Sequence, residues 1–315
     1  MKLFVTGASG YIGKVVVEHA VQAGHAVEGL ARNQEAAAKV SQLGATPVIG
    51  DLQSFDVLAA GASRADAVLH LAYIHDFGMD YSIVIETEVK AVTALVEGAH
   101  GKPIITTSGT AVAAPAPDGG ETDETAPINE GFVLGKRIRA ERAVLDLAED
   151  GAHVVAVRLP PYVYGRGGSF FVPMLMQQAA KHGVSAWVEG AVKRTSDVDV
   201  DDVARFYLAA AASAPAGSLY NCTGETDVTT RQLAEAIGQV LDVPARGLRR
   251  AEVEALWGPF LAGFVDYDNR ASSAKAQREL GWRPRAKYGL LADITTGSYS
   301  ELARQLREGR MACRE

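Results

Sequence analysis

The chain has 315 residues, of which 48% are hydrophobic and 22% charged, and its formal net charge is −7. A chain of this length can bury a large core without disulfides or metal ions, so one large domain or two closely packed ones are expected. The mild charge and the absence of a Lys/Arg cluster argue against nucleic acid or an acidic membrane as a partner.

Cysteine usage and the start of the chain bear on the cellular compartment. Cys222 and Cys313 are the only cysteines, too few for a disulfide framework or a thiolate metal site, and no metal is expected. The run 1–7 reaches a glycine at once and leaves no room for the apolar region of a signal peptide. The longest apolar helix candidate, near 203–214, contains Arg205 and is too short to span a bilayer. We therefore expect a soluble, cytoplasmic protein.

Short apolar runs alternate with amphipathic segments through the first half of the chain. The runs predict strands over 2–6, 26–30, 46–49, 67–71, 103–107 and 154–159. Helical patterns lie between them, among them 12–23, 83–99 and 130–149. This alternation implies right-handed crossovers and a parallel sheet covered on both faces. The predicted fold is α/β, a doubly wound parallel sheet of the Rossmann type over residues 1–165, with ligands at the carboxyl ends of the strands.

Beyond residue 165 the alternation becomes irregular. Helical patterns occupy 171–181, 229–241 and 272–280, and short strands are predicted over 185–188 and 219–222. We expect a smaller C-terminal substrate lobe over 166–315, with segments that return to the Rossmann core. The polar, Gly/Pro-rich stretch 113–127 is predicted to be a surface loop beside the site.

A glycine-rich turn, Thr6-Gly7-Ala8-Ser9-Gly10-Tyr11-Ile12-Gly13, separates the first strand from the first helix. Gly7 permits the tight turn, Gly10 lets backbone approach a pyrophosphate, and Gly13 allows close helix packing. A purely structural turn is the alternative, but the position after the first strand favours a dinucleotide. The predicted cofactor-binding residues of this turn are Gly7, Ser9, Gly10, Tyr11, Ile12 and Gly13.

The end of the second predicted strand should lie beside the adenine ribose, where a carboxylate selects NAD and a cation accommodates the additional phosphate of NADP. Arg32 stands at this point, in Gly29-Leu30-Ala31-Arg32-Asn33. A guanidinium pairs well with phosphate. NADP is therefore predicted over NAD, unless Arg32 is only a solvated loop residue.

Further motifs occur in a fixed order along nearly the whole chain, and together with the glycine turn they resemble the extended short-chain dehydrogenase/reductase family, also called the NAD-dependent epimerase/dehydratase family. They are Gly50-Asp51-Leu52, His70-Leu71-Ala72, Arg158-Leu-Pro-Pro-Tyr-Val-Tyr-Gly165, Val200-Asp-Asp-Val-Ala204 and the run from Ser273-Ala-Lys275 to Leu280-Gly-Trp-Arg-Pro284. The resemblance implies that Asp51 and Leu52 bind the adenine. It also implies that the backbone of Leu71, Ala72 and Tyr73 passes the cofactor.

The chain departs from this family at the catalytic residues. The family uses a Tyr-x-x-x-Lys pair, and the aligned positions here are Phe132 and Lys136. Phenylalanine has no exchangeable proton, so it cannot act as the acid, although Lys136 can still bind the nicotinamide ribose. The family's Ser/Thr falls on Ser108 or Gly109, with Thr110 close by, and its supporting Asn aligns with Glu88. This pattern resembles the atypical members of the superfamily.

Another side chain must supply the proton if the protein is an enzyme. His75, next to Asp76, follows the fourth strand and titrates near neutral pH. Tyr81, Tyr162 and Tyr164 are further phenol candidates. The predicted catalytic residues are Ser108, Thr110, Lys136 and His75.

Three functions fit these observations. The leading hypothesis is an NADP(H)-dependent oxidoreductase that acts on a small carbonyl or alcohol substrate. The alternatives are a sugar-nucleotide epimerase or dehydratase, and a noncatalytic NADP-binding sensor or scaffold, which the missing tyrosine favours. A helix-mediated homodimer is left open by the resemblance.

Overall fold

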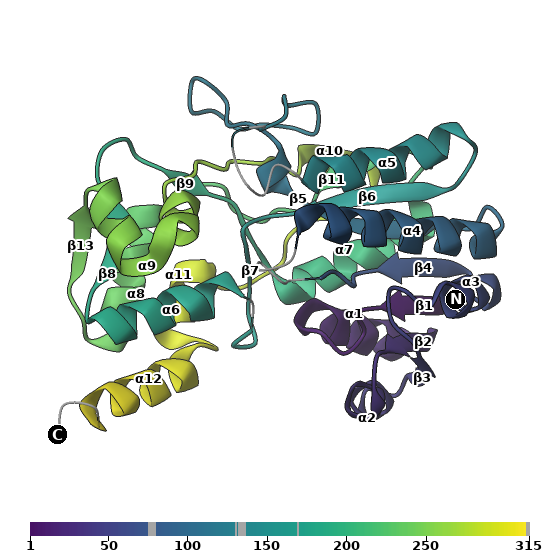
Figure 1. Cartoon of the computed structure of the whole chain (residues 1–315), viewed down its shortest axis with the longest axis horizontal. Coiled ribbons are helices and arrows are strands. Elements are labelled where there is room, and N and C mark those ends of the chain that lie inside the picture. The colour runs from purple at the N-terminus through teal and green to yellow at the C-terminus, as the bar shows by residue number, and fades with distance from the viewer. Residues whose placement is uncertain (75–79, 130, 132–136, 169, 313–315) are drawn as a thin grey trace.

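A computed structural model of the chain describes residues 1–74, 80–129, 131, 137–168 and 170–312. Seven parallel strands form the central sheet in the order β11-β6-β5-β4-β1-β2-β3 (Figure 1). They are β1 (Lys2–Thr6), β2 (Ala26–Ala31), β3 (Thr46–Ile49), β4 (Ala67–His70), β5 (Ile104–Gly109), β6 (Val154–Leu159) and β11 (Leu219–Asn221). The strand order reverses direction between β1 and β4, as in a doubly wound sheet. The predicted fold class is confirmed.

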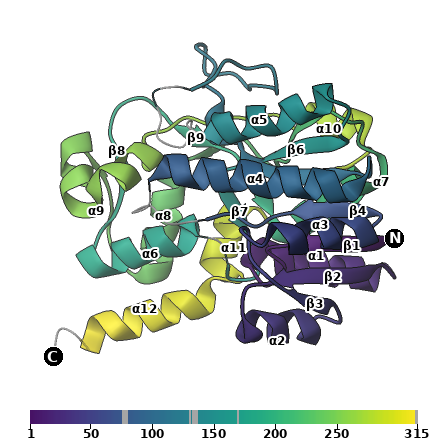
Figure 2. The same ribbon diagram turned by 45° about the vertical axis from the view of Figure 1, so that its right-hand side comes forward.

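Helices cover both faces of the sheet because its strands are apolar on both sides. Leu3 and Val5 of β1 pack with α1 (Tyr11–Gln22) and α7 (Val200–Ser213). Phe4, between them, points to the opposite face and packs with α3 (Phe55–Arg64) and α4 (Tyr81–Ala99). Figure 2 shows α3, α4 and α5 (Ile138–Glu149) side by side on that face. The short α2 (Gln34–Gln42) packs beside β2 and β3.

The predicted strands agree with the observed ones to within two residues, and two of the differences matter for the site. β4 ends at His70, so Leu71 already belongs to the following loop. β5 continues to Gly109, so Ser108 lies inside the strand, and Thr110 begins the 3-10 turn η1 (Thr110–Val112). Of the helix predicted over 130–149, residues 130 and 132–136 lie outside the described residues.

The smaller lobe, which lies beside the sheet domain in Figure 1, has its own hydrophobic core. It contains α6 (Phe171–His182), β8 (Ser185–Val188), α8 (Thr230–Leu241), β13 (Ala245–Leu248), α9 (Arg250–Val265), α11 (Leu290–Thr296) and α12 (Ser300–Ala312). β13 pairs with β8 in parallel. Two short strand pairs connect the smaller lobe with the sheet domain. They are β7 (Tyr162–Tyr164) with β10 (Asp197–Asp199), and β9 (Arg194–Thr195) with β12 (Val228–Thr229).

Several segments beyond residue 165 return to the sheet domain. α7 packs on α1, and β11 extends the central sheet beside β6. α10 (Ala274–Glu279) contacts β11. The loop over 113–127 is tied to this returning segment, because Thr122 N–H donates to Arg270 O at 2.8 Å and Asn221 N–H donates to Glu124 Oε1 at 2.7 Å.

A buried ion pair fastens α5 to the sheet. The Arg158 guanidinium in β6 donates to both carboxylate oxygens of Glu141, at 2.6 to 3.2 Å, and both side chains are at most 5% exposed. Breaking such a pair on one side leaves an uncompensated buried charge, which is strongly destabilising. Among the helices of the described ranges, none is both long and apolar enough to cross a membrane.

Candidate functional site

The turn between β1 and α1 is held together by close backbone contacts that admit only glycine. Gly7 has φ +70°, and a Cβ there would lie 2.8 Å from Ala72 N. A Cβ on Gly13 would lie 2.0 Å from Gly7 O. Gly10 N–H donates to Gly7 O at 2.9 Å, and α1 begins at the next residue with no acidic side chain in its first turn. The N–H groups at the start of α1 are therefore suited to bind an anion.

The loop after β4 lies against this turn. Leu71 N–H donates to Thr6 O at 3.3 Å, and Ala72 N–H donates to the Thr6 hydroxyl at 3.2 Å. Thr6 Oγ1 also lies 2.9 Å from His70 Nδ1. The structure thus brings together the glycine turn and residues 71 and 72, which the sequence could connect only through a family resemblance.

Two predicted cofactor residues of the turn have side chains that serve packing. The Tyr11 hydroxyl donates to Gly165 O at 2.7 Å, and its ring occupies the space where a Cβ on Gly168 would lie. Ile12 packs partly buried against the main core. Either residue would therefore contribute backbone N–H groups to a phosphate, whereas the side chain of Ser9 is half-buried within the turn itself.

The adenine end of the predicted site is exposed. Arg32 directly follows β2 and has no hydrogen bond or ion pair with the described part of the chain, while its neighbour Asn33 caps α2 by accepting from Ala36 N–H at 2.9 Å. Asp51 Oδ1 accepts from Gln53 N–H at 2.9 Å and from the Ser54 hydroxyl at 3.0 Å. This local turn fixes the Asp51 carboxylate just beyond β3. The adjacent Leu52 packs partly against the cluster around α3.

The two predicted hydroxyl residues differ in availability. Ser108 is 5% exposed, and its Oγ is buried without a hydrogen-bond partner in the described residues. The Thr110 hydroxyl instead donates to Asn269 Oδ1 at 2.9 Å. Thr110 therefore anchors the segment that returns from the smaller lobe, whereas the buried Ser108 hydroxyl has no partner within the described residues.

Sequence reasoning did not find Arg137, which lies at the carboxyl end of β5. Its Nη2 donates to Thr107 O at 2.8 Å, and its guanidinium lies 3.9 Å from the centre of the Tyr73 ring. Nη2 is also 3.9 Å from Glu88 Oε1. Glu88 is 6% exposed, and burial raises its pKa although the charge of Arg137 opposes this. The only signals in the sequence were the dibasic pair at 136–137 and the acid at the family's Asn position.

The three phenol candidates, Tyr81, Tyr162 and Tyr164, differ in their surroundings. Tyr162 is fully buried in the core of the smaller lobe, and the Tyr164 hydroxyl donates to Tyr288 O at 2.8 Å. Both are structural, which corrects the expectation that they could act as acids. Tyr81 lies at the start of α4, and its hydroxyl accepts from the Tyr73 hydroxyl at 3.1 Å. Of the other predicted residues, Phe132, Lys136, His75 and Asp76 lie outside the described residues.

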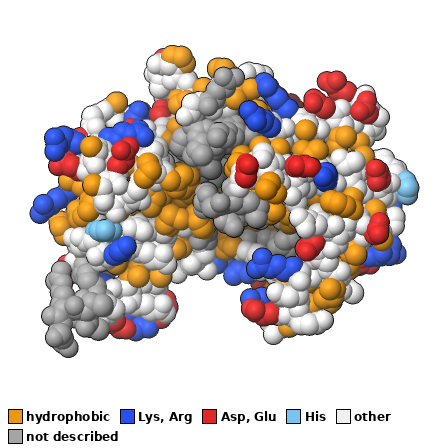
Figure 3. Space-filling view, viewed as in Figure 1, with side chains coloured by type: hydrophobic (Ala, Val, Ile, Leu, Met, Phe, Trp, Pro, Cys, Tyr) orange, Lys and Arg blue, Asp and Glu red, His pale blue; other side chains and the backbone are white. Residues whose placement is uncertain are grey.

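The edge of the smaller lobe that faces the sheet domain is apolar. Figure 3 shows hydrophobic side chains gathered there. Phe171 begins α6, directly after the segment that Tyr11 contacts, and its ring stacks on Phe264 of α9 with centroids 3.9 Å apart. Phe260 stacks on Phe264 at 6.3 Å. These rings form an apolar cluster at the edge of the core of the smaller lobe.

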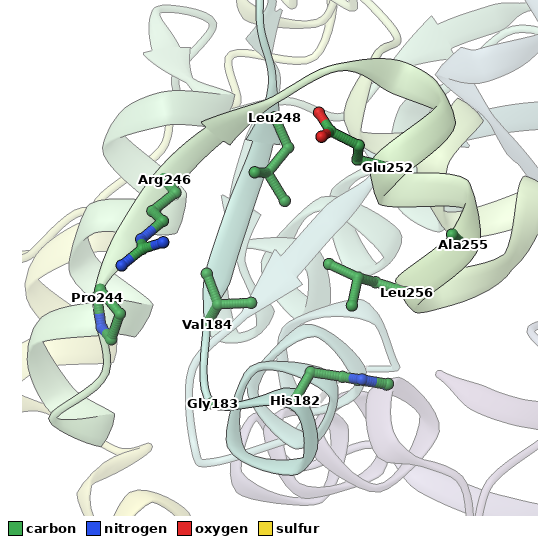
Figure 4. A pocket seen from close by; sticks show the side chains of 9 residues that line it. All are labelled: His182, Gly183, Val184, Pro244, Arg246, Leu248, Glu252, Ala255 and Leu256. Carbon is green, nitrogen blue, oxygen red and sulfur yellow. The ribbon is translucent and has the colours of Figure 1, made fainter.

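A separate hollow of about 520 Å³ lies on the smaller lobe, between β13, α9 and the turn from α6 to β8 (Figure 4). It contains none of the predicted site residues; its lining is His182, Gly183, Val184, Pro244, Arg246, Leu248, Glu252, Ala255 and Leu256. Within the described ranges, no group of three or more His, Cys, Asp or Glu side chains gathers as metal ligands would.

The chain is similar to known proteins over nearly its full length. An uncharacterized protein of Schizosaccharomyces pombe is 35% identical over 301 residues, covering 95% of this chain and 100% of that protein. A 4-hydroxy-2-methyl-3-oxo-4-farnesyl-3,4-dihydroquinoline-1-oxide ketoreductase of Stigmatella aurantiaca is 30% identical and covers 91% of this chain and 93% of its own length.

Solved structures show the same fold. The crystal structure of gox2253 has a TM-score of 0.77 and 26% identity, covering 97% of this chain and 98% of that one. The structure of MoeE5 in complex with UDP-glucose and NAD has a TM-score of 0.74 and 20% identity, covering 97% of this chain and 100% of that one. Residues 3–223 match the NAD dependent epimerase/dehydratase family. The glycine turn, the sheet order and this match agree, and the chain belongs to the NAD-dependent epimerase/dehydratase family.

Proposed function

We propose that the protein is an NADP(H)-dependent oxidoreductase that reduces small carbonyl compounds, or oxidises the corresponding alcohols, with a non-standard proton donor. The observation that carries this proposal is the glycine turn between β1 and α1, together with an exposed arginine at the end of β2. The glycine turn would hold the pyrophosphate at the start of α1, and residues 71–73 would line the path toward the nicotinamide.

Arg32 supports the phosphorylated cofactor. It is exposed and unpaired within the described residues, and the run from Gly29 to Asn33 contains no carboxylate that would bind a ribose hydroxyl. A guanidinium can hold a 2′-phosphate with two parallel hydrogen bonds. Asp51 would then serve the adenine amino group, for which it is fixed by its local turn.

A reductase is favoured over an epimerase by two observations. The ketoreductase of Stigmatella aurantiaca is similar over nine-tenths of the chain, and the apolar cluster of Phe171, Phe260 and Phe264 suits an apolar carbonyl compound better than a sugar. The cofactor, when bound, supplies the hydride. Ser108 is the described hydroxyl that could hydrogen-bond the substrate oxygen, since its Oγ has no other partner in the described ranges.

A noncatalytic NADP-binding sensor is the second candidate, favoured by Phe132 at the family's tyrosine position. A cofactor titration followed by a substrate panel separates the two. NADPH fluorescence should show saturable binding, and the loss of NADPH absorbance should reveal turnover with aromatic aldehydes, ketones or quinones. Binding without turnover across the panel would support the sensor. The absence of NADPH binding would contradict both proposals.

A further inference from the structure

Two tyrosines form a hydrogen-bonded pair where β4 meets α4. Tyr73 lies three residues beyond β4, and Tyr81 is the first residue of α4, whose N-cap Asp80 accepts from Ser82 N–H at 2.9 Å. The Tyr73 hydroxyl donates to the Tyr81 hydroxyl at 3.1 Å, and both side chains are half-buried. The pair therefore lies at the carboxyl edge of the sheet, next to the switch point between β1 and β4 where ligands bind in this fold.

Tyr81 is distinguished from the other phenols by the direction of its hydrogen bond. The chain has ten tyrosines. Five donate to protein acceptors, namely Tyr11 to Gly165 O, Tyr164 to Tyr288 O, Tyr220 to Glu279, Tyr267 to Ala113 O and Tyr299 to Gly168 O. Tyr207 is fully buried against Thr107, Tyr162 is enclosed in the core, and Tyr288 is 62% exposed. Tyr81 accepts from Tyr73 and so keeps its own proton to donate.

Arg137 connects this pair to the end of β5. Its guanidinium stacks on the Tyr73 ring and donates to Thr107 O, the carbonyl directly before Ser108. A cation over a phenol ring makes its hydroxyl a stronger donor. The phenol pair and the cation therefore form one connected group at the carboxyl edge of the sheet, which reaches the backbone carbonyl next to Ser108.

We propose that Tyr81 donates the proton to the carbonyl oxygen of the substrate, in place of the family tyrosine that Phe132 replaces, and that Tyr73 and Arg137 are positioning residues. This inference rests on the proposed reductase function. The carbonyl carbon gains a hydride from NADPH, which is oxidised to NADP⁺, and the carbonyl oxygen gains the Tyr81 proton to give the alcohol. The Tyr81 phenolate is reprotonated by Tyr73, which regains its proton from water.

The groups around the pair keep Tyr81 in its protonated form. Burial is the largest effect and raises the pKa of Tyr81, and the nearby carboxylate of Glu88 acts in the same direction. The charge of Arg137 opposes them. His70, at the end of β4, is neutral near pH 7 because burial lowers its pKa to about 4. Tyr81 therefore stays protonated at neutral and mildly alkaline pH.

The test compares Tyr81→Phe with Tyr288→Phe, which removes an exposed hydroxyl, using 9,10-phenanthrenequinone and 4-nitrobenzaldehyde as probes. Tyr81→Phe should lower kcat about 10²- to 10⁴-fold, the contribution of a general acid, without changing the dissociation constant for NADPH. Tyr73→Phe should cause a smaller loss, and Tyr288→Phe none. In the protein without cofactor, ¹³C NMR of ζ-labelled tyrosine should show Tyr81 still protonated at mildly alkaline pH.

The pH profile distinguishes Tyr81 from His75. With a phenol donor, kcat for reduction should stay level as the pH rises through neutrality, whereas a histidine donor would lose its proton above about pH 6.5. Two results would overturn the assignment of Tyr81 and leave the proposed reductase intact. One is full turnover in Tyr81→Phe. The other is a wild-type kcat that falls above neutral pH, together with loss of activity in His75→Ala. A wild type that binds NADPH but reduces neither probe contradicts the reductase itself, and the assignment fails with it.

Discussion

Arg32 is the residue on which we propose that the choice of cofactor depends. Its side chain is exposed at the end of β2 and makes no hydrogen bond or ion pair within the described part of the chain, although the hydrogen bond from Lys39 and, less strongly, the charge of Arg32 lower the pKa of Glu35. Its interaction with a phosphate would therefore not have to break an internal ion pair. The position is set by β2 on one side and by the Asn33 cap of α2 on the other. A charge-assisted hydrogen bond of this kind contributes about 1.5–3 kcal/mol.

Replacing Arg32 by alanine should therefore remove most of a preference for NADPH over NADH. The wild type should bind NADPH roughly 10- to 100-fold more tightly, which corresponds to that free energy. Isothermal titration calorimetry with both cofactors measures the two dissociation constants. Arg283→Ala, which removes an exposed arginine outside the predicted site, serves as the control. Equal affinities in the wild type would show that Arg32 does not select the cofactor.

At the scale of secondary-structure elements, the junction of β1 with α1 determines where the proposed cofactor site lies. A short turn joins them, and its carbonyl at Gly7 lies where a side chain on Gly13 would begin. The same turn touches the loop after β4 through Thr6 and Ala72. The proposed site thus depends on β1, α1 and the loop after β4, whose backbones lie in contact. An added side-chain atom between them must push these elements apart.

The substitution Gly13→Ala tests this close packing. The new Cβ would lie 2.0 Å from Gly7 O, so α1 must shift away from the turn. We expect NADPH binding to be largely lost and the free energy of unfolding to fall by about 1–3 kcal/mol, as for other overpacked sites. Fluorescence titration and urea denaturation measure the two effects.

Gly309→Ala is the matched control for this substitution. Gly309 lies in α12, and nothing lies within 4 Å of an added Cβ. Alanine there should be neutral or should stabilise the protein by up to about 1 kcal/mol, because it favours the helix. If Gly13→Ala behaved like Gly309→Ala, the close contact would not be required for binding.

At the scale of the whole molecule, His70 makes stability depend on pH. It is 1% exposed at the end of β4, next to Thr6, and burial together with the charge of Arg137 lowers its pKa to about 4. In the unfolded chain a histidine titrates near pH 6.5. Between these values the unfolded chain binds a proton that the native protein does not, so stability rises with pH across this window and is lost as the pH falls.

We expect the titration of His70 to lower the free energy of unfolding by about 3 kcal/mol as the pH falls from about 6.5 to about 4. His70→Asn should reduce that dependence, since asparagine does not titrate. Urea denaturation at several pH values measures it. His100→Asn is the control, because His100 is exposed and has φ +50°, which asparagine tolerates. A His70→Asn protein with the same loss of stability in acid would assign the dependence to other groups.

The sequence by itself determined the doubly wound sheet, the turn over 6–13 and the place of Arg32. These features are local: apolar runs of strand length predict β1 to β6, and the glycine spacing records contacts made within one turn and its helix. The family motifs added two further predictions, that Asp51 and the loop after β4 bind the cofactor.

Only the tertiary structure decided which side chains near the candidate site have protein partners and which do not. Thr110 is bound by Asn269, Tyr164 by Tyr288 O, and Arg137 reaches Thr107 and Tyr73 from a different segment. Each of these contacts joins residues at least thirty positions apart. Hydrogen-bond partners are set by how strands and helices pack in space, and no spacing in the sequence records that arrangement.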